Sequence, residues 1–297
     1  MPVQPVKKAI IPVAGYGTRF LPYTKSIPKE MLPIIDRPVI HHIVEEVAQA
    51  GISEIILITG TNKRSLEDYF DYNLELEMLL EKSGKLAQKD LSREASDLAS
   101  FVYVRQKEQL GNGHAVLQAK ELIGPDEPFV VLWGDEMFMG KPSKVQQLVD
   151  AYQQHGKPVI MTMECTNAED YDRYGYIVPG AELGDNVREV KGLIEKPGQE
   201  NTPSTYASLG CMVLTGDIFN YLATQKPGNG GEIVLAEALN SYVQAGNTLL
   251  SKEVTGLKYY DCGNKLEYMK ATVEFALQRG DIGEKFSTYL KDRAASL

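Results

Sequence analysis

The chain has 297 residues, of which 43% are hydrophobic and 24% are charged, proportions typical of a globular protein. Its formal net charge of −9 excludes the general basic surface of a nucleic-acid binder, so a phosphate ligand would need locally gathered cations or a metal. The three cysteines are scattered and form no C-x-x-C pair, which argues against a disulfide framework or a zinc site and fits a reducing compartment.

The first apolar run, residues 8–13, is too short for a signal sequence and leads directly into glycine-rich sequence, so we interpret it as a strand. No stretch approaches the ~18 apolar residues that a membrane span needs. We therefore expect a cytoplasmic protein with neither a membrane nor a nucleic-acid partner.

Strand-like apolar runs continue to alternate with helical patterns after this first strand. Further strands are expected at 54–58, 101–105, 129–133 and 158–163, and helices at 39–50, 114–122 and 145–154. This alternation predicts an α/β fold that is Rossmann-like, with a mixed, mainly parallel sheet and helices on both faces.

Two segments interrupt the alternation, and a third follows it. Residues 69–100 have a charged helical pattern and are expected to form an inserted helical hairpin. Residues 164–205 are rich in Gly, Pro, Asp and Asn, which predicts loops and short antiparallel strands around an opening. We expect residues 1–265 to form one α/β domain, and residues 266–297 to form amphipathic helix that packs on the core or on another subunit.

A glycine loop, residues 14–20, directly follows the first strand. Glycines allow the backbone to approach a phosphate or a flat base, and free N–H groups stabilise negative charge. Phe20 stands where a dinucleotide-binding fingerprint needs its third glycine, and the Gly-Lys-Ser/Thr of a P-loop is absent. Taken alone, the loop is as consistent with an ordinary strand-to-helix turn as with an anion site.

A basic loop comes next. Its three prolines between positions 22 and 33 forbid a regular helix, so Arg19, Lys25 and Lys29 are displayed from a stiff segment. A fixed cation beside a triphosphate neutralises charge that develops during transfer. Isolated lysines are usually solvated, but the nearby glycine loop and the acidity of the chain favour a functional interpretation.

Carboxylates follow three later apolar runs. Asp135 lies after the predicted strand at 129–133, where ligands of open α/β sheets bind, and is placed to hold Mg²⁺ unless it only caps a turn. Glu195 and Lys196 offer a carboxylate for sugar hydroxyls and an ammonium for a phosphate, although an exposed ion pair is the simpler alternative. Asp261 ends another run and is a candidate second metal carboxylate.

Taken in order, these features make the chain resemble the bacterial UTP–glucose-1-phosphate uridylyltransferases, also called UDP-glucose pyrophosphorylases. The resemblance covers nearly the whole chain and rests on the ordered motifs AIIPVAGYGTRFLPYTKSIPKEMLPI, FDYNLELEMLLEKSGK, VRQKEQLGNGHAV, RYGYI, LIEKP, KPGNGGEI and YYDCGNKLEYMKATVEFAL. Related enzymes that use dTTP share the glycine loop but typically carry a KQLLPI-like stretch and lack the helical insertion. KEMLPI and GNGHAV therefore favour UTP.

The resemblance implies a role for each candidate residue. The residues expected around the uracil and ribose are Ala14, Gly15, Glu30, Gln106 and Gly111. Those expected to hold the triphosphate are Gly17, Thr18, Arg19 and Lys29. Those expected to contact the sugar phosphate are Gly175, Glu195, Gly210 and, at its phosphate, Lys196. Mg²⁺ is expected on Asp135 and Asp261.

The implied reaction is direct. An oxygen of glucose 1-phosphate attacks the α-phosphorus of UTP in line, and pyrophosphate leaves. The attacking phosphate is already anionic, so no general base is required, and catalysis rests on positioning and on charge neutralisation by Arg19, Lys29, Lys196 and Mg²⁺. The amphipathic C-terminal helices suggest a homodimer or a homotetramer.

The chain departs from the family pattern at three places. Trp133-Gly134-Asp135-Glu136 replaces a Pro-Asp-Asp type sequence, Asn112 stands where an apolar residue is common, and Asn264 stands where Asp is common. A thymidylyl- or cytidylyltransferase of a related sugar phosphate therefore stays open. An inactive regulatory paralogue is a further alternative. The charged residues expected at the site are retained, which argues against it: Arg19, Lys29, Asp135, Glu195 and Lys196. A dinucleotide-dependent dehydrogenase is excluded because the third glycine of the dinucleotide-binding fingerprint is missing.

Overall fold

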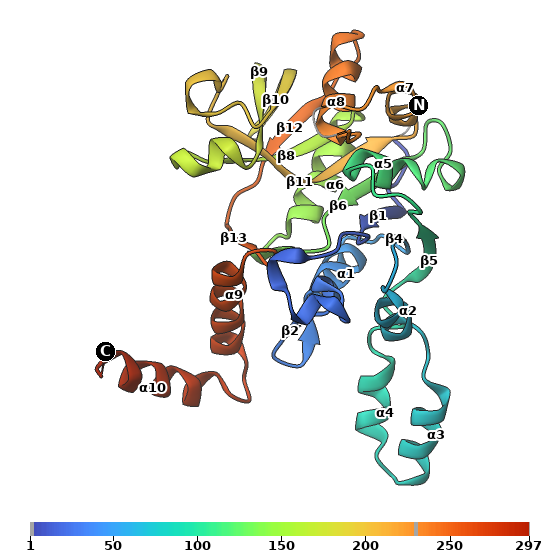
Figure 1. Cartoon of the computed structure of the whole chain (residues 1–297), viewed down its shortest axis with the longest axis vertical. Coiled ribbons are helices and arrows are strands. Elements are labelled where there is room, and N and C mark those ends of the chain that lie inside the picture. Colours follow the sequence, from blue (N-terminus) through green and yellow to red (C-terminus); the bar gives the residue numbers. More distant parts are fainter. Residues whose placement is uncertain (1–2, 229–230, 297) are drawn as a thin grey trace.

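A nine-stranded sheet runs through the centre of the protein (Figure 1). The structure, a computed structural model, describes residues 3–228 and 231–296. The strands of this sheet are β1 (Lys8–Pro12), β4 (Glu54–Thr59), β5 (Ser100–Arg105), β6 (Pro128–Leu132), β8 (Val159–Glu164), β9 (Gly175–Gly184), β10 (Val187–Glu195), β11 (Tyr206–Thr215) and β12 (Leu250–Glu253). Their order across the sheet is β5-β4-β1-β6-β11-β8-β12-β10-β9.

The sheet is mixed, as predicted. β1 pairs parallel with β4 and β6, β4 with β5, and β8 with β12, whereas β10 and β11 run antiparallel to every strand they pair with. Seven of the nine strands therefore share one direction, and two oppose it. The central strands β1, β4 and β6 are short apolar runs that are buried on both faces, which is why helices have to cover the sheet on either side.

Helices cover both faces of the sheet, as the alternating pattern predicts (Figure 1). They are α1 (Val39–Gln49), α2 (Arg64–Phe70), α3 (Leu74–Lys82), α4 (Leu86–Arg93), α5 (Asn112–Leu117), α6 (Lys144–His155), α7 (Ile218–Thr224), α8 (Leu235–Gln244), α9 (Lys265–Gln278) and α10 (Gly283–Ala294). Successive residues of β1 point to opposite faces: Ala9 and Ile11 join the core beneath α1 and α6, and Ile10 joins the core beneath α5, α7 and α8.

Two small sheets lie beside the main one. β2 (Pro33–Ile34) pairs with β3 (Arg37–Pro38), and β7 (Glu136–Gly140) pairs with β13 (Leu257–Asp261). The pair of β7 and β13 is important for the site, because its register places Asp261 opposite Glu136. The basic loop between β1 and β2 forms short 3-10 turns at Thr18–Phe20, Tyr23–Lys25 and Lys29–Met31.

Two expectations differ from the structure. The strands within 164–205 are not short: β9 has ten residues and β10 has nine, because Asp185 and Asn186 adopt positive φ angles of 50° and 56° and close a tight hairpin between them. The helix expected at 114–122 begins earlier, at Asn112, since Gly111 turns the chain with a φ of 101°. That helix ends at Leu117, and a 3-10 turn at Lys120–Leu122 follows.

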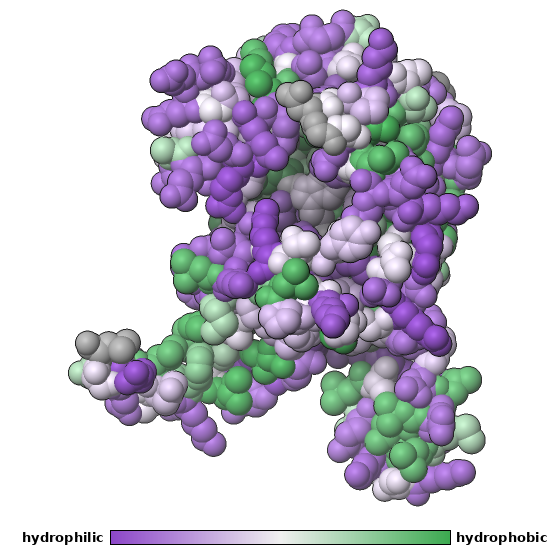
Figure 2. Space-filling view, in the orientation of Figure 1, coloured by the Kyte–Doolittle hydropathy of each residue, from purple (hydrophilic) through white to green (hydrophobic). Residues whose placement is uncertain are grey.

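Two helical extensions project from the body (Figure 1). The segment expected to form a helical hairpin holds α3 and α4, and the expected boundary near residue 265 falls at the first residue of α9. Figure 2 shows apolar side chains gathered on the hairpin. The exposed ones on the two extensions include Leu74, Met78, Leu79, Leu86, Leu91, Leu266, Met269 and Tyr289. No helix in the described part of the chain has the length and apolar character of a membrane span.

Two adjacent histidines of α1 pack against other helices, His42 against α9 and His41 against α2. His42 packs against Phe275 of α9 with ring centroids 4.8 Å apart, and His41 shares a 3.0 Å hydrogen bond with the Tyr69 hydroxyl. Burial lowers the pKa of each imidazole to about 4, with a further contribution from the positive charge of Arg37. Both rings are therefore neutral in the folded protein at pH values where the unfolded chain already binds protons.

Acid should destabilise the protein through these histidines. An unfolded histidine titrates near pH 6.5, so the unfolded state binds more protons between about pH 6.5 and pH 4, and stability falls as the pH drops through that window. Each histidine is expected to lower the free energy of unfolding by about 2 kcal/mol between about pH 7.5 and pH 5. Urea unfolding of wild type and His42→Leu at both pH values measures this. The variant should lose about 2 kcal/mol less than wild type, and an equal loss in both proteins would show that His42 is not responsible.

Candidate active site

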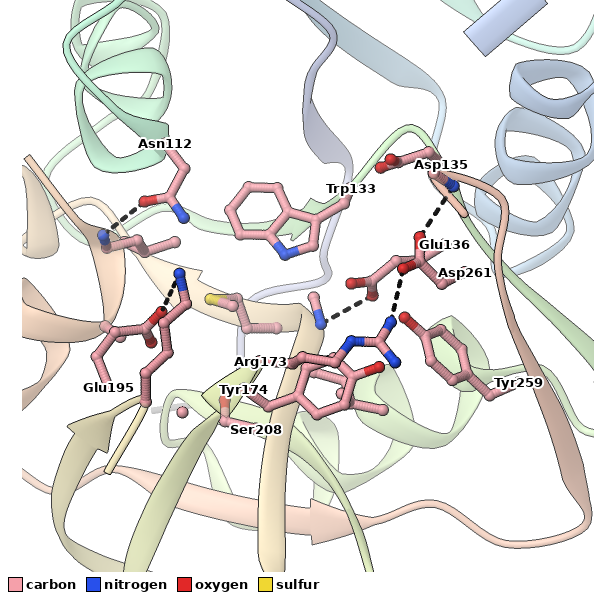
Figure 3. A pocket seen from close by; sticks show the side chains of 18 of the residues that line it. Asn112, Trp133, Asp135, Glu136, Arg173, Tyr174, Glu195, Ser208, Tyr259 and Asp261 are labelled. Atoms are coloured by element: carbon pink, nitrogen blue, oxygen red, sulfur yellow. Dashed lines mark hydrogen bonds and ion pairs between the residues drawn. The ribbon is translucent and has the colours of Figure 1, made fainter. Parts of the chain in front are cut away.

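Two adjoining cavities open beside the carboxyl ends of β1 and β6. The larger has a volume of about 560 Å³ and the smaller of about 380 Å³. Four residues line both cavities and so mark their junction: Lys29, Asn112, Trp133 and Asp135. Figure 3 shows Trp133 between Asn112 and Asp135. Two groups of ligand atoms can therefore bind side by side with a shared point of contact.

The smaller cavity is lined by small residues and by the amide side chains of Gln106, Gln109 and Asn112, with charged groups beside them. Gln109 Nε2 donates a 2.7 Å hydrogen bond to Ala14 O, and Gln106 Nε2 donates a 3.2 Å bond to Gly111 O. An ideal Cβ at Gly111 would lie 2.5 Å from Ile233 O, and its φ of 101° is strained for any other residue, so glycine is required there. A flat ligand with hydrogen-bonding edges suits such a wall.

A buried ion pair forms the back of this cavity. Glu30 is 1% exposed and Lys63 is 4% exposed, and Lys63 Nζ lies 2.8 Å from Glu30 Oε2. Burial raises the pKa of Glu30, although the neighbouring Lys63 and Lys29 oppose the shift, and burial lowers the pKa of Lys63. Lys63 was not among the residues expected at the site, because nothing in the local sequence indicates a partner 33 residues away.

The larger cavity collects cations from distant segments. It is lined by Arg19 of the glycine loop, by Lys29 of the basic loop, and by Arg173 and Lys196, which flank the hairpin of β9 and β10. Arg173 lies in the RYGYI motif but was not given a role from the sequence. Its Nη2 lies 2.9 Å from Asp261 Oδ2, and Figure 3 shows this contact.

Glu195 and Lys196 both face the larger cavity although they are neighbours in sequence. Successive residues of a regular strand point to opposite faces. Lys196 has a φ of 46°, in the left-handed region, and this backbone turn at the end of β10 places both side chains in one cavity. Their charged atoms, Lys196 Nζ and Glu195 Oε1, lie 3.9 Å apart. Burial raises the pKa of Glu195, and the positive charge of Lys196 partly offsets the shift.

Two carboxylates meet at Gly263. An ideal Cβ on this glycine would lie 2.7 Å from Asp135 Oδ2 and 2.9 Å from Asp261 Oδ1, so both oxygens point toward the same small space. Carboxylate oxygens are ligands that Mg²⁺ accepts, and this ion usually takes one or two of them together with water and phosphate oxygens. In the described residues no group of three or more His, Cys, Asp or Glu could hold a metal. The pair therefore fits a metal that is shared with a phosphate ligand.

Lys29 is the cation closest to these carboxylates. Its Nζ lies 2.5 Å from Asp135 Oδ2. Burial lowers the pKa of Lys29, but Asp135, Glu30 and Asp261 together outweigh that effect and raise the pKa above its ordinary value. Lys29 therefore carries a positive charge at neutral pH, fixed at the junction of the two cavities.

Two glycines shape the lining of the larger cavity. An ideal Cβ at Gly175 would lie 2.9 Å from Glu195 Oε2, and one at Gly210 would overlap the ring of Trp133. The Gly210 N–H donates a 3.0 Å hydrogen bond to Glu136 Oε2. Burial and the adjacent Asp135 raise the pKa of Glu136 to about 8.

Every residue that was given a role from the sequence lines one of the two cavities, whereas Lys25 of the basic loop lines neither. Those of the smaller cavity are Ala14, Gly15, Glu30, Gln106 and Gly111. Those of the larger cavity are Gly17, Thr18, Arg19, Gly175, Glu195, Lys196, Gly210 and Asp261. Lys29 and Asp135 line both. The fold thus brings the candidates together, and the ligand that each one contacts stays a prediction.

Comparison with known proteins agrees with this arrangement. UTP–glucose-1-phosphate uridylyltransferase 2 of Staphylococcus saprophyticus subsp. saprophyticus is 46% identical over 286 residues, which cover 96% of this chain and 97% of that protein. The crystal structure of a UDP-glucose pyrophosphorylase complexed with UDP-glucose is 39% identical, with a TM-score of 0.81, and the match covers 92% of this chain and all of that one.

A third relative is the UTP-bound UGPase of Acinetobacter baumannii. It is 34% identical, with a TM-score of 0.85, and the match covers 96% of this chain and 98% of that one. The family model described as nucleotidyl transferase matches residues 8–278. The chain therefore belongs to the nucleotidyl transferase family.

Proposed function

We propose that the protein transfers the uridylyl group of UTP to α-D-glucose 1-phosphate and so forms UDP-glucose and pyrophosphate. The observation that carries the proposal is the pair of cavities joined at Lys29 and Asp135. A nucleotide sugar has a base at one end, a sugar at the other and phosphates between them, which is the order of chemical groups along this cleft. The names of the relatives above support the same substrates.

The nucleotide occupies the smaller cavity and reaches the junction with its phosphates. The uracil and ribose lie against Ala14, Gly15, Glu30, Gln106 and Gly111, where backbone and amide groups offer hydrogen bonds. The triphosphate lies on the loop of Gly17, Thr18 and Arg19, close to Lys29. Gly17 is at a φ of 64° with an ideal Cβ 3.0 Å from Lys29 Cβ, so the close approach of this loop to Lys29 depends on glycine.

The sugar phosphate occupies the larger cavity. Glu195 accepts hydrogen bonds from sugar hydroxyls, the backbone at Gly175 and Gly210 lies against the ring, and Lys196 binds the phosphate. The two charges of the Glu195–Lys196 pair are already held 3.9 Å apart on one wall, so they are positioned for a ligand that has hydroxyls next to a phosphate.

The reaction needs no protein nucleophile. A phosphate oxygen of glucose 1-phosphate forms a bond to the α-phosphorus of UTP while the bond from that phosphorus to the pyrophosphate oxygen breaks, and no proton has to move. Lys29, Arg19 and Lys196 neutralise charge on the attacking and leaving groups. Mg²⁺, held by Asp135 and Asp261, supplies further charge neutralisation when it is bound. The remaining contribution of the chain is to align the two substrates.

Pyrophosphate release with different nucleotides tests the proposal. With glucose 1-phosphate and Mg²⁺, UTP should give a kcat/KM at least about tenfold above those for dTTP and CTP. EDTA should stop release, and added Mg²⁺ should restore it. Activity confined to dTTP or CTP would show that this nucleotide, and not UTP, is the substrate. No release with any nucleotide would favour an inactive regulatory paralogue, and release that is insensitive to EDTA would contradict the metal assignment.

Lys29 should be essential for the rate. Lys29→Gln removes the fixed charge at the junction and is expected to lower kcat on the order of 100-fold or more. Lys25→Gln is the matched control, because Lys25 lies exposed on the same loop and lines neither cavity. Circular dichroism checks that both variants are folded. Turnover of Lys29→Gln above half that of Lys25→Gln would show that this cation is not part of the catalytic machinery.

We also propose that the protein acts in the cytoplasm as a homodimer or homotetramer that uses the segment 266–297. Leu266, Met269 and Tyr289 are each more than half exposed there, an arrangement typical of a surface that another chain covers. Light scattering should give a mass at least twice the 32.9 kDa of one chain. The double variant Leu266→Lys with Met269→Lys should lower it. A wild-type mass of one chain contradicts assembly, and an unchanged mass in the variant places the contact elsewhere.

A further inference from the structure

Trp133 occupies the junction of the two cavities. It is the single tryptophan of the chain and follows the last residue of β6. Its backbone N–H donates a 3.0 Å hydrogen bond to Gly210 O, which continues the pairing of β6 with β11. It lines both cavities, together with Lys29, Asn112 and Asp135. Its ring therefore lies where the sugar phosphate and the nucleotide would meet.

The indole ring rests directly on the backbone of Gly210. An ideal Cβ at Gly210 would overlap Cδ1 and Nε1 of the ring, so the five-membered part of the indole takes the space that any other residue at this position would need. The peptide beneath the ring is fixed as well, because Gly210 N donates to Glu136 Oε2. Since Gly210 lines the larger cavity but not the smaller one, the N–H edge of the ring belongs to the larger cavity.

The indole N–H has an open hydrogen-bonding position. Among residues 3–228 and 231–296, no backbone or side-chain acceptor takes a hydrogen bond from Trp133 Nε1, and this atom is not among the buried atoms without a partner. Figure 3 shows the nitrogen-bearing edge turned toward the interior of the pocket. A partly buried tryptophan usually pairs its N–H. Here the acceptor has to come from the solvent or from a ligand in the cavity.

We propose that Trp133 determines sugar specificity: its indole N–H donates a hydrogen bond to one hydroxyl oxygen of the glucose ring, and its ring face separates the sugar from the nucleotide. The proposal rests on the proposed function and adds a substrate contact to it. The acceptor is a hydroxyl rather than the phosphate, because the indole N–H is an uncharged donor that lies over the Gly210 backbone, whereas Lys29, Arg19 and Lys196 already provide charge for phosphates.

A site that hydrogen-bonds a hydroxyl discriminates against sugars that lack it, because its donor is then left unpaired. Trp133→Phe keeps an aromatic ring on Gly210 and removes only the donor. It is expected to lower kcat/KM for glucose 1-phosphate about tenfold, with the KM for UTP unchanged within about twofold. Tyr72→Phe, which removes a hydroxyl from an exposed ring that lines neither cavity, is the matched control and should behave as wild type.

Deoxy sugars identify the partner of the N–H. Wild type and Trp133→Phe are compared on the 2-, 3-, 4- and 6-deoxy analogues of glucose 1-phosphate. For one analogue the two proteins should have equal kcat/KM, because neither can form the hydrogen bond, while the other three should show the same difference as glucose 1-phosphate. An equal loss on all four analogues would overturn the proposal, since the effect of the variant would then be independent of any ring hydroxyl.

The fluorescence of the single tryptophan separates this proposal from the proposed function. UDP-glucose should change the emission of Trp133, and the analogue identified above, as its UDP-sugar, should change it less. If wild type releases no pyrophosphate from UTP and glucose 1-phosphate, the proposed function fails, but this binding experiment still tests the contact. Emission unchanged by UDP-glucose, or changed equally by every deoxy analogue, would overturn the role of Trp133.

Discussion

The site depends on one interaction, the contact between Lys29 and Asp135. The chain carries a net charge of −9, so a place for phosphates has to be created against its overall charge. Removing a cation from water is costly unless anions surround it, and Asp135, Glu30 and Asp261 supply them here. Glu30 is in turn paired with the buried Lys63. These contacts keep Lys29 charged and in one position, so that little reorganisation is needed when a phosphate arrives.

The two halves of the sheet supply the two cavities that meet at this contact. The glycine loop and the basic loop follow β1, and Asp135 follows β6, so this half of the sheet forms the proposed nucleotide side. The antiparallel strands β10 and β11 carry Glu195 and Gly210 on the proposed sugar side. The ribbon of β7 and β13 joins them, because its register places the second carboxylate, Asp261, beside the first. In-line transfer requires this arrangement, since the two substrates have to meet at one phosphorus.

Much of the fold could be predicted from local patterns. The buried strands are continuous apolar runs, and all the residues that were given a role from the sequence line one of the two cavities. Contacts between distant segments could not be predicted. The pairs Lys63–Glu30 and Arg173–Asp261 join residues 33 and 88 positions apart, and no local pattern encodes them. Lys196 adopts a positive φ at the end of β10, which brings its side chain into the same cavity as Glu195. The length of β9 and β10 depended on a hairpin turn at Asp185 and Asn186 that the polar composition concealed.

The crystal structure of the protein with UDP-glucose and Mg²⁺ would test the central claim most directly. We expect the uracil in the cavity lined by Gln106 and Gly111, the glucose against Glu195 and Gly210, and the diphosphate between them, within reach of Lys29 Nζ and beside Asp135. A uracil bound in the larger cavity, or a diphosphate that lies away from Lys29, would contradict it.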